Sequence, residues 1–262
     1  MCISDSVGVG GTNNTADVKT VQLLLNLNRA RFALPAPLDA DGRLGAKSSG
    51  ALEAFQAQVM GLAPTDGRVA PGSATLAALA AGMPPGFSGE KLQGILINAP
   101  KQRVDRYAGP LASKMVAYAI DTSLRQAHFL AQLGHESGEL RYTEELASGD
   151  AYEGRRDLGN TAPGDGQRFK GRGLIQLTGR ANYQAYGDAI GRNLVDGDNP
   201  NLLATDPELA VDVACWFWQS HGLSDLADQD DVIRITKKIN GGLNGLPERE
   251  RLLGRGRFFL VG

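Results

Sequence analysis

The stretch AQLGHESGEL, residues 131–140, places a histidine and two carboxylates at the end of an apolar run with helical spacing. Phe129, Leu130 and Leu133 form the apolar stripe, and Glu136 follows Leu133 by three positions. That spacing predicts a Glu136 carboxyl group on the buried side of a helix, near its end. A carboxyl group against apolar walls has a raised pKa and can keep a proton near neutral pH. Glu136 is therefore a candidate general acid for cleaving a glycosidic bond, and the alternative is a glutamate exposed at a helix terminus.

The same residues match metal sites only in part. HESGE begins like the His-Glu-x-x-His pattern of zinc proteases, but Glu139 stands where the second histidine is required. His128 and His135 lie seven positions apart and could share a helix face, but no cysteine partners accompany them. The DADG segment at 39–42 lacks the distal bidentate glutamate of a calcium loop. We expect no metal and no cofactor, and we assign His135 a role in orienting the site.

Composition sets the broad class. The chain has 262 residues and a formal net charge of -2, so nothing global favours nucleic acid or a membrane surface as a partner. Cys2 and Cys215 have neither disulfide nor metal spacing, and Cys215 lies in an apolar run that predicts burial. The N-terminus shows no basic region followed by an apolar core, so we expect no secretory signal and accumulation in the cytoplasm.

Helical periodicity dominates the first eighty residues. We expect helices over 16–28, 49–59 and 72–82, the last beginning at an N-cap, Ser73. An internal echo accompanies them, because DGRLGAKSSGAL at 41–52 resembles DGRVAPGSATLAAL at 66–79. The Pro- and Gly-rich segment GMPPGFSG at 82–89 breaks helix on both sides and predicts a domain boundary. We therefore expect domains over 5–82 and 90–262, with a linker at 83–89.

The second part of the chain also reads as mainly helical. Helical periodicity recurs in six segments, beginning EKLQ, YAGP, SLRQ, GLIQ, DPEL and DVIR. A turn-rich stretch, ASGDAYEGRRDLGNTAPGDGQRFKGRG, separates the third segment from the fourth and has room for a short hairpin. We expect a mainly α protein of two domains, a small three-helix domain followed by a larger helical one.

The Asp-Gly-Arg turns followed by helices, together with ALEAFQ, resemble the small three-helix peptidoglycan-binding domain found beside many wall-degrading enzymes. The resemblance covers roughly residues 5–82. The alternative is a helical module with another partner, or with none.

Further on, the segments AHFLAQLGHESGELRYTEE, FKGRGLIQLTGRANY and KKINGG, taken in order, resemble glycoside hydrolase family 19. That family contains plant-type chitinases and many phage endolysins, and its fold is lysozyme-like. The resemblance implies an inverting mechanism with Glu136 as the general acid. A second carboxylate, roughly 6.5–9.5 Å away, would activate water. We favour Glu153, in the turn-rich stretch, as this general base and keep Glu145 as the rival; Glu139 and Glu144 are expected to be solvated.

The resemblance also implies a set of substrate-contacting residues. Thr178 falls where the family places a hydroxyl that holds the attacking water, and the alternative is a helix N-cap. The residues expected to contact sugar are His135, Tyr152, Gln176, Asn182 and Asn240. Side-chain amides suit this work because they both donate and accept hydrogen bonds. For Gln176 and Asn182 the alternative is a structural hydrogen bond within the cleft loops.

Charged and aromatic side chains cluster around these positions. The basic residues could offset nearby carboxylates or meet the acidic groups of peptidoglycan, or they could form structural pairs with Asp157 and Asp165. They are Arg155, Arg156, Arg168, Lys170, Arg172 and Arg180. Tyr152, Phe169 and Tyr183 could supply apolar faces for sugar rings, whereas the aromatic residues at 216–218 are expected in the core.

Together these features predict an endolysin-type muramidase that cleaves the β-1,4 bond between N-acetylmuramic acid and N-acetylglucosamine in peptidoglycan. The alternatives are a chitinase of the same family and a non-catalytic cell-wall-binding protein. We expect a monomer that gathers in the host cytoplasm, is released by a holin-type protein, and acts on the periplasmic cell wall without binding nucleic acid or membrane.

Overall fold

The computed structural model describes residues 2–261 and is mainly helical, as the sequence predicts. Contacts divide it into two compact units, one made of residues up to Asn98 together with those from Leu253 onward, and one spanning Ala99–Leu252. The predicted boundary at 83–89 lies within the first unit, between two of its helices. The limits of a wall-binding domain stay a prediction, because a compact unit is not by itself a functional module. Within the described residues no helix has both the length and the apolar character needed to cross a membrane.

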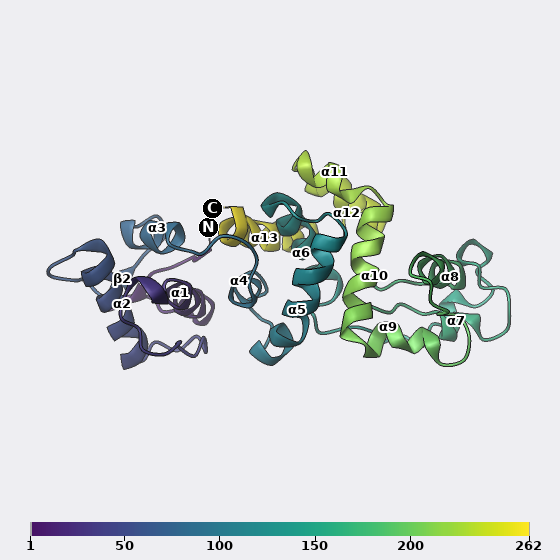
Figure 1. The fold of residues 1–262 in the computed structure, drawn as a ribbon, viewed down its shortest axis with the longest axis horizontal. Helices are drawn as coiled ribbons and strands as arrows, with labels where there is room; N and C mark the ends of the chain where they lie inside the picture. The colour runs from purple at the N-terminus through teal and green to yellow at the C-terminus, as the bar shows by residue number, and fades with distance from the viewer. Residues whose placement is uncertain (1, 262) are drawn as a thin grey trace. The chain divides into compact units, whose positions relative to one another are not determined.

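The first unit contains the three helices predicted from the early periodicity (Figure 1). Its elements are β1 (Val7–Gly8), α1 (Thr15–Leu27), η1 (Arg29–Arg31), α2 (Ala46–Met60), β2 (Arg68–Val69), α3 (Ala74–Ala81), α4 (Gly89–Ile95) and η5 (Arg257–Val261). β1 and β2 pair antiparallel. Ser73 caps α3 by accepting a hydrogen bond from the Leu76 amide, which confirms the predicted N-cap.

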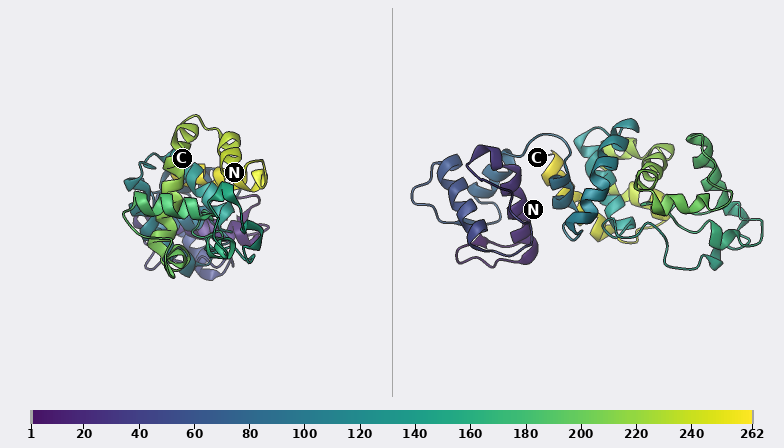
Figure 2. Two further views of the ribbon diagram at one scale, coloured as in Figure 1. Left: turned by 90° about the vertical axis from the view of Figure 1, so that its right-hand side faces the viewer. Right: turned by 60° about the horizontal axis from the view of Figure 1, so that its bottom comes forward.

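The core of this unit collects the apolar faces of its helices. Leu24, Leu52, Phe55 and Leu79 are almost completely buried. The end of the chain belongs to the same core, and the last turns lie beside the first residues (Figure 2). Phe259 packs so closely on Gly94 that a Cβ there would come within 2.4 Å of its ring.

The second unit carries the candidate catalytic residues. Its elements are α5 (Lys101–Ala117), α6 (Ser123–Glu136), η2 (Asp150–Tyr152), η3 (Arg156–Leu158), α7 (Asp165–Arg168), α8 (Arg180–Ala189), η4 (Asn199–Asn201), α9 (Leu202–Thr205), α10 (Pro207–Ser220), α11 (Leu223–Asp228), α12 (Val232–Asn240) and α13 (Leu246–Gly256), whose last residues enter the first unit. α10 packs along α5. The expected hairpin is wrong: the turn-rich stretch forms short helical turns, and among the described residues only isolated bridges join Arg172 to Glu144 and Leu177.

A buried polar contact ties α5, α8 and α10 together. Asp212 accepts hydrogen bonds from the hydroxyls of Tyr118 and Tyr186, each at 2.8 Å, and pairs with Lys114 at 2.6 Å. Burial and the neighbouring carboxylate raise the pKa of both tyrosines. Cys215 and Trp218 are buried as expected, and Trp216 and Phe217 are partly buried.

Candidate active site

Glu136 is the last residue of α6, and its side chain is 19% exposed. The spacing argument therefore placed it correctly, at the helix end and mostly sheltered. Its direct partner, however, is a charge: the Nη2 group of Arg249 donates a hydrogen bond to Oε1 of Glu136. The immediate neighbour of the Glu136 carboxyl group is thus a guanidinium, whereas the sequence predicted apolar walls.

Arg249 is the residue that the sequence analysis missed. It is fully buried and also donates to the side-chain oxygen of Gln132, one turn before Glu136 on α6. Gln132 in turn donates to Thr236 of α12 at 3.4 Å. One network of hydrogen bonds therefore connects Glu136 and Gln132 of α6 to Thr236 of α12 and Arg249 of α13. The sequence did contain a sign of its burial. Leu252 and Leu253 follow Arg249 by three and four residues, and this helical spacing places Arg249 on the buried face of α13.

His135, the residue before Glu136, is held by α13. Nδ1 of His135 lies 2.7 Å from a carboxylate oxygen of Glu248, and its ring covers Gly245, where a Cβ would lie 2.0 Å from the ring. His128 is buried and contacts Asp230 at 2.7 Å. His135 and His128 therefore each face a carboxylate from a distant segment of the chain. Among the described residues no group of three or more His, Cys, Asp or Glu side chains is arranged to hold a metal ion.

Glu145 is held by a neighbouring segment in a well-defined orientation. Its Oε1 accepts a hydrogen bond of 3.1 Å from the hydroxyl of Tyr152, and its Oε2 accepts one of 3.1 Å from the amide of Gly171. The Glu145 amide completes the pair by donating to the Gly171 carbonyl at 2.9 Å. Burial and the bond to this carboxylate raise the pKa of Tyr152. Two predicted site residues, Glu145 and Tyr152, are thus in contact.

Glu153 is exposed, and both of its carboxylate oxygens bind backbone amides. Oε1 accepts from Gly164 and Oε2 accepts from Gly166, each at 2.8 Å. These amides lie at the start of α7, so the carboxylate organises the loop that leads into this short helix. Glu145 is thus half-buried beside Tyr152, whereas Glu153 is exposed on the loop before α7, and the identity of the base stays a prediction.

The amide and hydroxyl residues of the IQLT segment form a short chain beside Glu145. A Cβ on Gly171 would lie 3.0 Å from Oε1 of Gln176 and 3.3 Å from Oε2 of Glu145, so both side chains flank this glycine. Gln176 adopts a φ of +59°, an uncommon conformation for a non-glycine residue and one often found at functional sites. Thr178 donates to the Gln176 carbonyl at 2.9 Å, and Asn182 donates to the Thr178 carbonyl at 2.7 Å.

These contacts resolve some of the alternatives. Thr178 is not a helix N-cap, because Gly179 holds that position ahead of α8. Asn182 and Gln176 donate structural hydrogen bonds to backbone carbonyls, and their contact with sugar stays a prediction. Asn240, the last residue of α12, is exposed. Its contact with sugar stays a prediction.

Two further expectations are wrong. Phe169 and Tyr183 are completely buried and pack edge to face, so they cannot present a face to sugar. Glu139 is also buried, accepting a hydrogen bond from the Ala99 amide at 3.1 Å and lying 3.4 Å from Arg251. Glu144 is 44% exposed, as expected, and pairs with Arg172.

The basic cluster forms structural contacts. Arg155 pairs with Asp157 and Arg180 with Asp165, each at 2.5 Å, as the structural alternative predicted. Asp165 is buried, and the Arg180 guanidinium holds the pKa of its carboxyl group below the usual value. Three further members of the cluster contact carboxylates or backbone carbonyls: Lys170 and Arg172 contact Glu144, and Arg168 binds the carbonyls of Val195 and Gly197. Arg156 is exposed.

Comparisons with known proteins identify the family. A family model described as chitinase class I matches residues 115–241. A glycosyl hydrolase family 19 domain-containing protein of Haemophilus influenzae is 34% identical, with 49% of this chain and 76% of that protein covered. An endochitinase of Arabidopsis thaliana is 35% identical, with 55% of this chain and 45% of the plant protein covered. Acidic endochitinase Q of Nicotiana tabacum is 38% identical, with 43% and 42% covered, so the chain spans less than half of these plant proteins.

Among solved structures, chitinase C from Streptomyces griseus has a TM-score of 0.56 and 24% identity, covering 67% of this chain and 92% of that one. This likeness supports the fold. The relative from Haemophilus influenzae is matched over most of its length, and the segments that carry Glu136, Glu145 and Thr178 lie within the residues matched by the family model. This chain therefore belongs to glycoside hydrolase family 19.

Proposed function

We propose that this glycoside hydrolase cleaves β-1,4 bonds by inversion, with Glu136 as general acid and Glu145 as general base. The observation that carries the assignment is the fixed orientation of Glu145 by Tyr152 and Gly171, beside Gln176. Glu153, by contrast, is exposed, and its carboxylate closes the loop that leads into α7 rather than lying beside Gln176. A base must keep a lone pair for water, and the carboxylate of Glu145 has lone pairs beyond its two hydrogen bonds.

The steps follow from these contacts. Arg249 contacts Oε1 of Glu136, so the proton for the leaving-group oxygen would be carried on Oε2. Glu145 would remove a proton from water, which attacks the anomeric carbon from the opposite face as the glycosidic bond breaks. Thr178 donates its own hydrogen to Gln176, and its oxygen can therefore accept a hydrogen bond from that water.

We propose peptidoglycan as the substrate and lysis of the host cell, after release from its cytoplasm by a separate protein, as the role. The support is the part of the first unit at residues 5–82, whose three α-helices and two Asp-Gly-Arg turns resemble a wall-binding domain. Chitin is the second candidate, favoured by the names of the plant relatives, which are endochitinases. Both polymers contain β-1,4-linked N-acetylglucosamine, so the site chemistry alone supports either.

The test compares the wild-type chain with Glu136→Gln and with a matched control, Glu144→Gln. Glu144 is 44% exposed, and its buried partner Arg172 also donates to the Arg168 carbonyl and the Tyr183 hydroxyl, so replacing Glu144 by glutamine should leave hydrolysis within about twofold. Loss of the general acid should lower the rate on purified sacculi by about a hundredfold or more. Full activity of Glu136→Gln would refute the mechanism.

Mass spectrometry of the products then identifies the substrate. Fragments with muramic acid at the reducing end support the muramidase assignment. Rapid release of sugars from chitin, with intact sacculi, would establish the chitinase instead. Peptide products would contradict both.

A further inference from the structure

The two Asp-Gly-Arg turns of the first unit are built in the same way. In the first turn a buried glutamine, Gln22 of α1, donates to Asp41, to the Arg43 carbonyl and to Ser48, and accepts from the Gly42 amide. The second turn repeats every contact with Gln56 of α2. Gln56 donates to Asp66, to the Arg68 carbonyl and to Thr75, and accepts from the Gly67 amide. The sequence echo is therefore a structural duplication.

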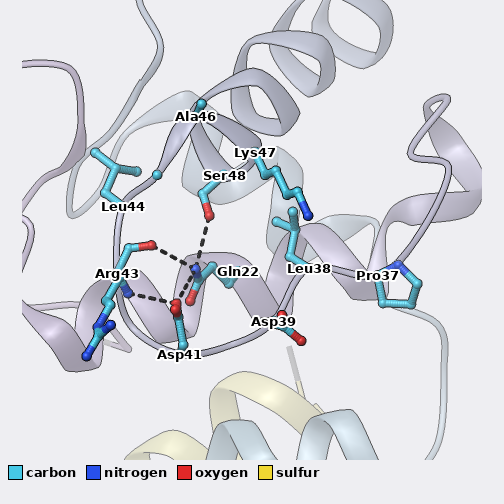
Figure 3. Close-up of a pocket in the computed structure, with 11 residues that line it drawn as sticks. Gln22, Pro37, Leu38, Asp39, Asp41, Arg43, Leu44, Ala46, Lys47 and Ser48 are labelled. Atoms are coloured by element: carbon cyan, nitrogen blue, oxygen red, sulfur yellow. Dashed lines mark hydrogen bonds between the residues drawn. The ribbon is translucent and has the colours of Figure 1, made fainter.

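The two copies differ in what lies outside the turn. Beside the second turn the chain places its own β1, which pairs with β2, and Val9 donates to the Gly67 carbonyl at 3.1 Å. Arg68 is occupied as well, because its guanidinium donates to Ser6. Beside the first turn lies a cavity of about 310 Å³ (Figure 3). One copy is thus closed by the chain itself, and the other is open.

The walls of this cavity are held rigidly by α1. Gln22 fixes the turn at 41–43, and Asn26, one helical turn later, exchanges two hydrogen bonds with the backbone of Leu38, at 2.7 and 2.9 Å. The side chains of Gln22 and Asn26 are buried, so the two segments that form the cavity walls are held by hydrogen bonds from the interior of the unit. Such a preformed cavity loses little conformational entropy when a ligand enters.

The rim carries side chains of both charges. Asp39, Arg43 and Lys47 line the cavity and are exposed, whereas Leu38 and Leu44 supply half-buried apolar surface (Figure 3). The carboxylate of Asp41 is already engaged by Gln22 and by the Arg43 amide. A complementary ligand therefore has both a carboxylate and an ammonium group, separated by a short apolar or amide segment.

We propose that this cavity binds the stem peptide of peptidoglycan, through Lys47 and Arg43 on its carboxylates and Asp39 on its ammonium group. The volume lies at the lower end of the range for ligand pockets, which suits a short peptide branch rather than a long glycan. An uncharged N-acetylglucosamine chain would leave the three rim charges without partners. The inference rests on the proposed cell-wall substrate and assigns the polymer's peptide to this cavity.

The experiment titrates the full chain with the synthetic tetrapeptide Ala-γ-Glu-diaminopimelate-Ala and follows amide resonances by NMR. We expect the peptide to shift the amides of residues 38–48. Lys47→Glu should weaken binding about tenfold or more. Gly45→Leu should do the same by filling the cavity, because a Cβ at Gly45, which lines the cavity, meets no atom within 4 Å.

A matched control keeps the interpretation specific. Gly50 also offers open space, lies within α2, whose N-cap is Gly45, and does not line the cavity, so Gly50→Leu should bind the peptide as the wild-type chain does. Far-UV circular dichroism of all three variants checks that α2 remains folded. Equal weakening by Gly50→Leu would contradict a site at the cavity.

Two further outcomes separate this inference from the proposed function. If the peptide leaves these resonances unmoved, or a chitin tetramer shifts them in its place in the Glu136→Gln background, the inference is wrong even if the chain digests sacculi. If the peptide binds as expected but sacculi stay intact and chitin is cleaved, the proposed substrate is wrong while the cavity assignment stands.

Discussion

At the level of single residues, the most informative pair is Glu136 and Arg249. The sequence showed that Glu136 belongs on a sheltered helix face, because local spacing determines which face a side chain occupies. It could not show the partner, which lies 113 positions away in the chain. Side chains that meet through tertiary folding leave no local pattern, and the same limit explains why Glu139, thought solvated, is buried.

Arg249 should be important for stability as well as for activity. Arg249→Met would leave the Glu136 carboxylate and the Gln132 amide without their buried partner, at a cost of about 3 kcal/mol in the free energy of unfolding. Arg249→Lys keeps the charge but loses the planar fork that reaches both groups, so we expect an intermediate loss. Chemical denaturation measures both variants. Equal stability of Arg249→Met and wild type would show that the network contributes nothing.

The two candidate bases can be separated by equivalent substitutions. Glu145→Gln should lower kcat by about a hundredfold or more, because the variant cannot take a proton from water. Glu153→Gln should retain most activity and mainly loosen the loop before α7, since an amide cannot accept from both Gly164 and Gly166. Steady-state rates and melting temperatures of both variants decide between them. The reverse ranking of kcat would restore Glu153 as the base.

At the level of elements, helical periodicity predicted where helices occur, whereas loop composition did not predict how the loops fold. Each segment predicted as helical contains a helix, because the buried faces repeat every three to four residues, as in α6 and α10. The segment that begins GLIQ is helical only from Arg180 onward. The composition of the stretch at 147–173 was compatible with a short hairpin, yet its glycines and polar residues form short turns closed by side chains. Glu153 and Asp165 close those turns through backbone amides, which is information that turn-rich composition does not contain.

The pair of Asp165 and Arg180 gives this loop a pH dependence. The folded-state pKa of Asp165 lies below its unfolded value of about 3.9, so its stabilisation is present above pH 4 and is lost as the pH falls through the lowered pKa. Asp165→Asn should therefore melt earlier at pH 7 and show a flatter decline of melting temperature between about pH 5 and pH 2.

The exposed pair of Arg155 and Asp157 is the matched control, because both side chains are at least half exposed. Asp157→Asn should change the melting temperature little at any pH, since solvent screens such pairs. Thermal melts across this pH range provide the measurement. A decline for Asp165→Asn as steep as that of the wild type would assign the acid sensitivity to other groups.

At the level of the whole molecule, the division of the chain into units departs from the order of its residues. The boundary predicted from Pro and Gly content at 83–89 does mark a break between helices, because α3 ends at Ala81 and α4 begins at Gly89. The contacts nevertheless group α4 and the final residues with the first unit. Composition locates breaks in secondary structure, but it cannot show which distant segments share a core.

Arg255 is the residue through which the end of the chain joins that core. Its guanidinium donates to the Gly94 carbonyl at 2.7 Å, and to the Cys2 carbonyl and the Thr20 hydroxyl, each at 2.9 Å. Arg255→Met keeps a long apolar side chain but leaves three acceptors without this donor, so the first unit should lose about 3 kcal/mol of stability. The exposed Arg29 in the same unit is the control, and Arg29→Met should have little effect.

The readout for Arg255 must distinguish the two units. In limited proteolysis, Arg255→Met should be cut faster within residues 1–98, while its rate on a small soluble oligosaccharide stays close to that of the wild type, because the candidate catalytic residues lie in the other unit. The same substitution should weaken binding to sacculi as the first unit opens. If activity on the small substrate fell in parallel with protease resistance, the two units would unfold together, and the final residues would support the whole molecule rather than the first unit alone.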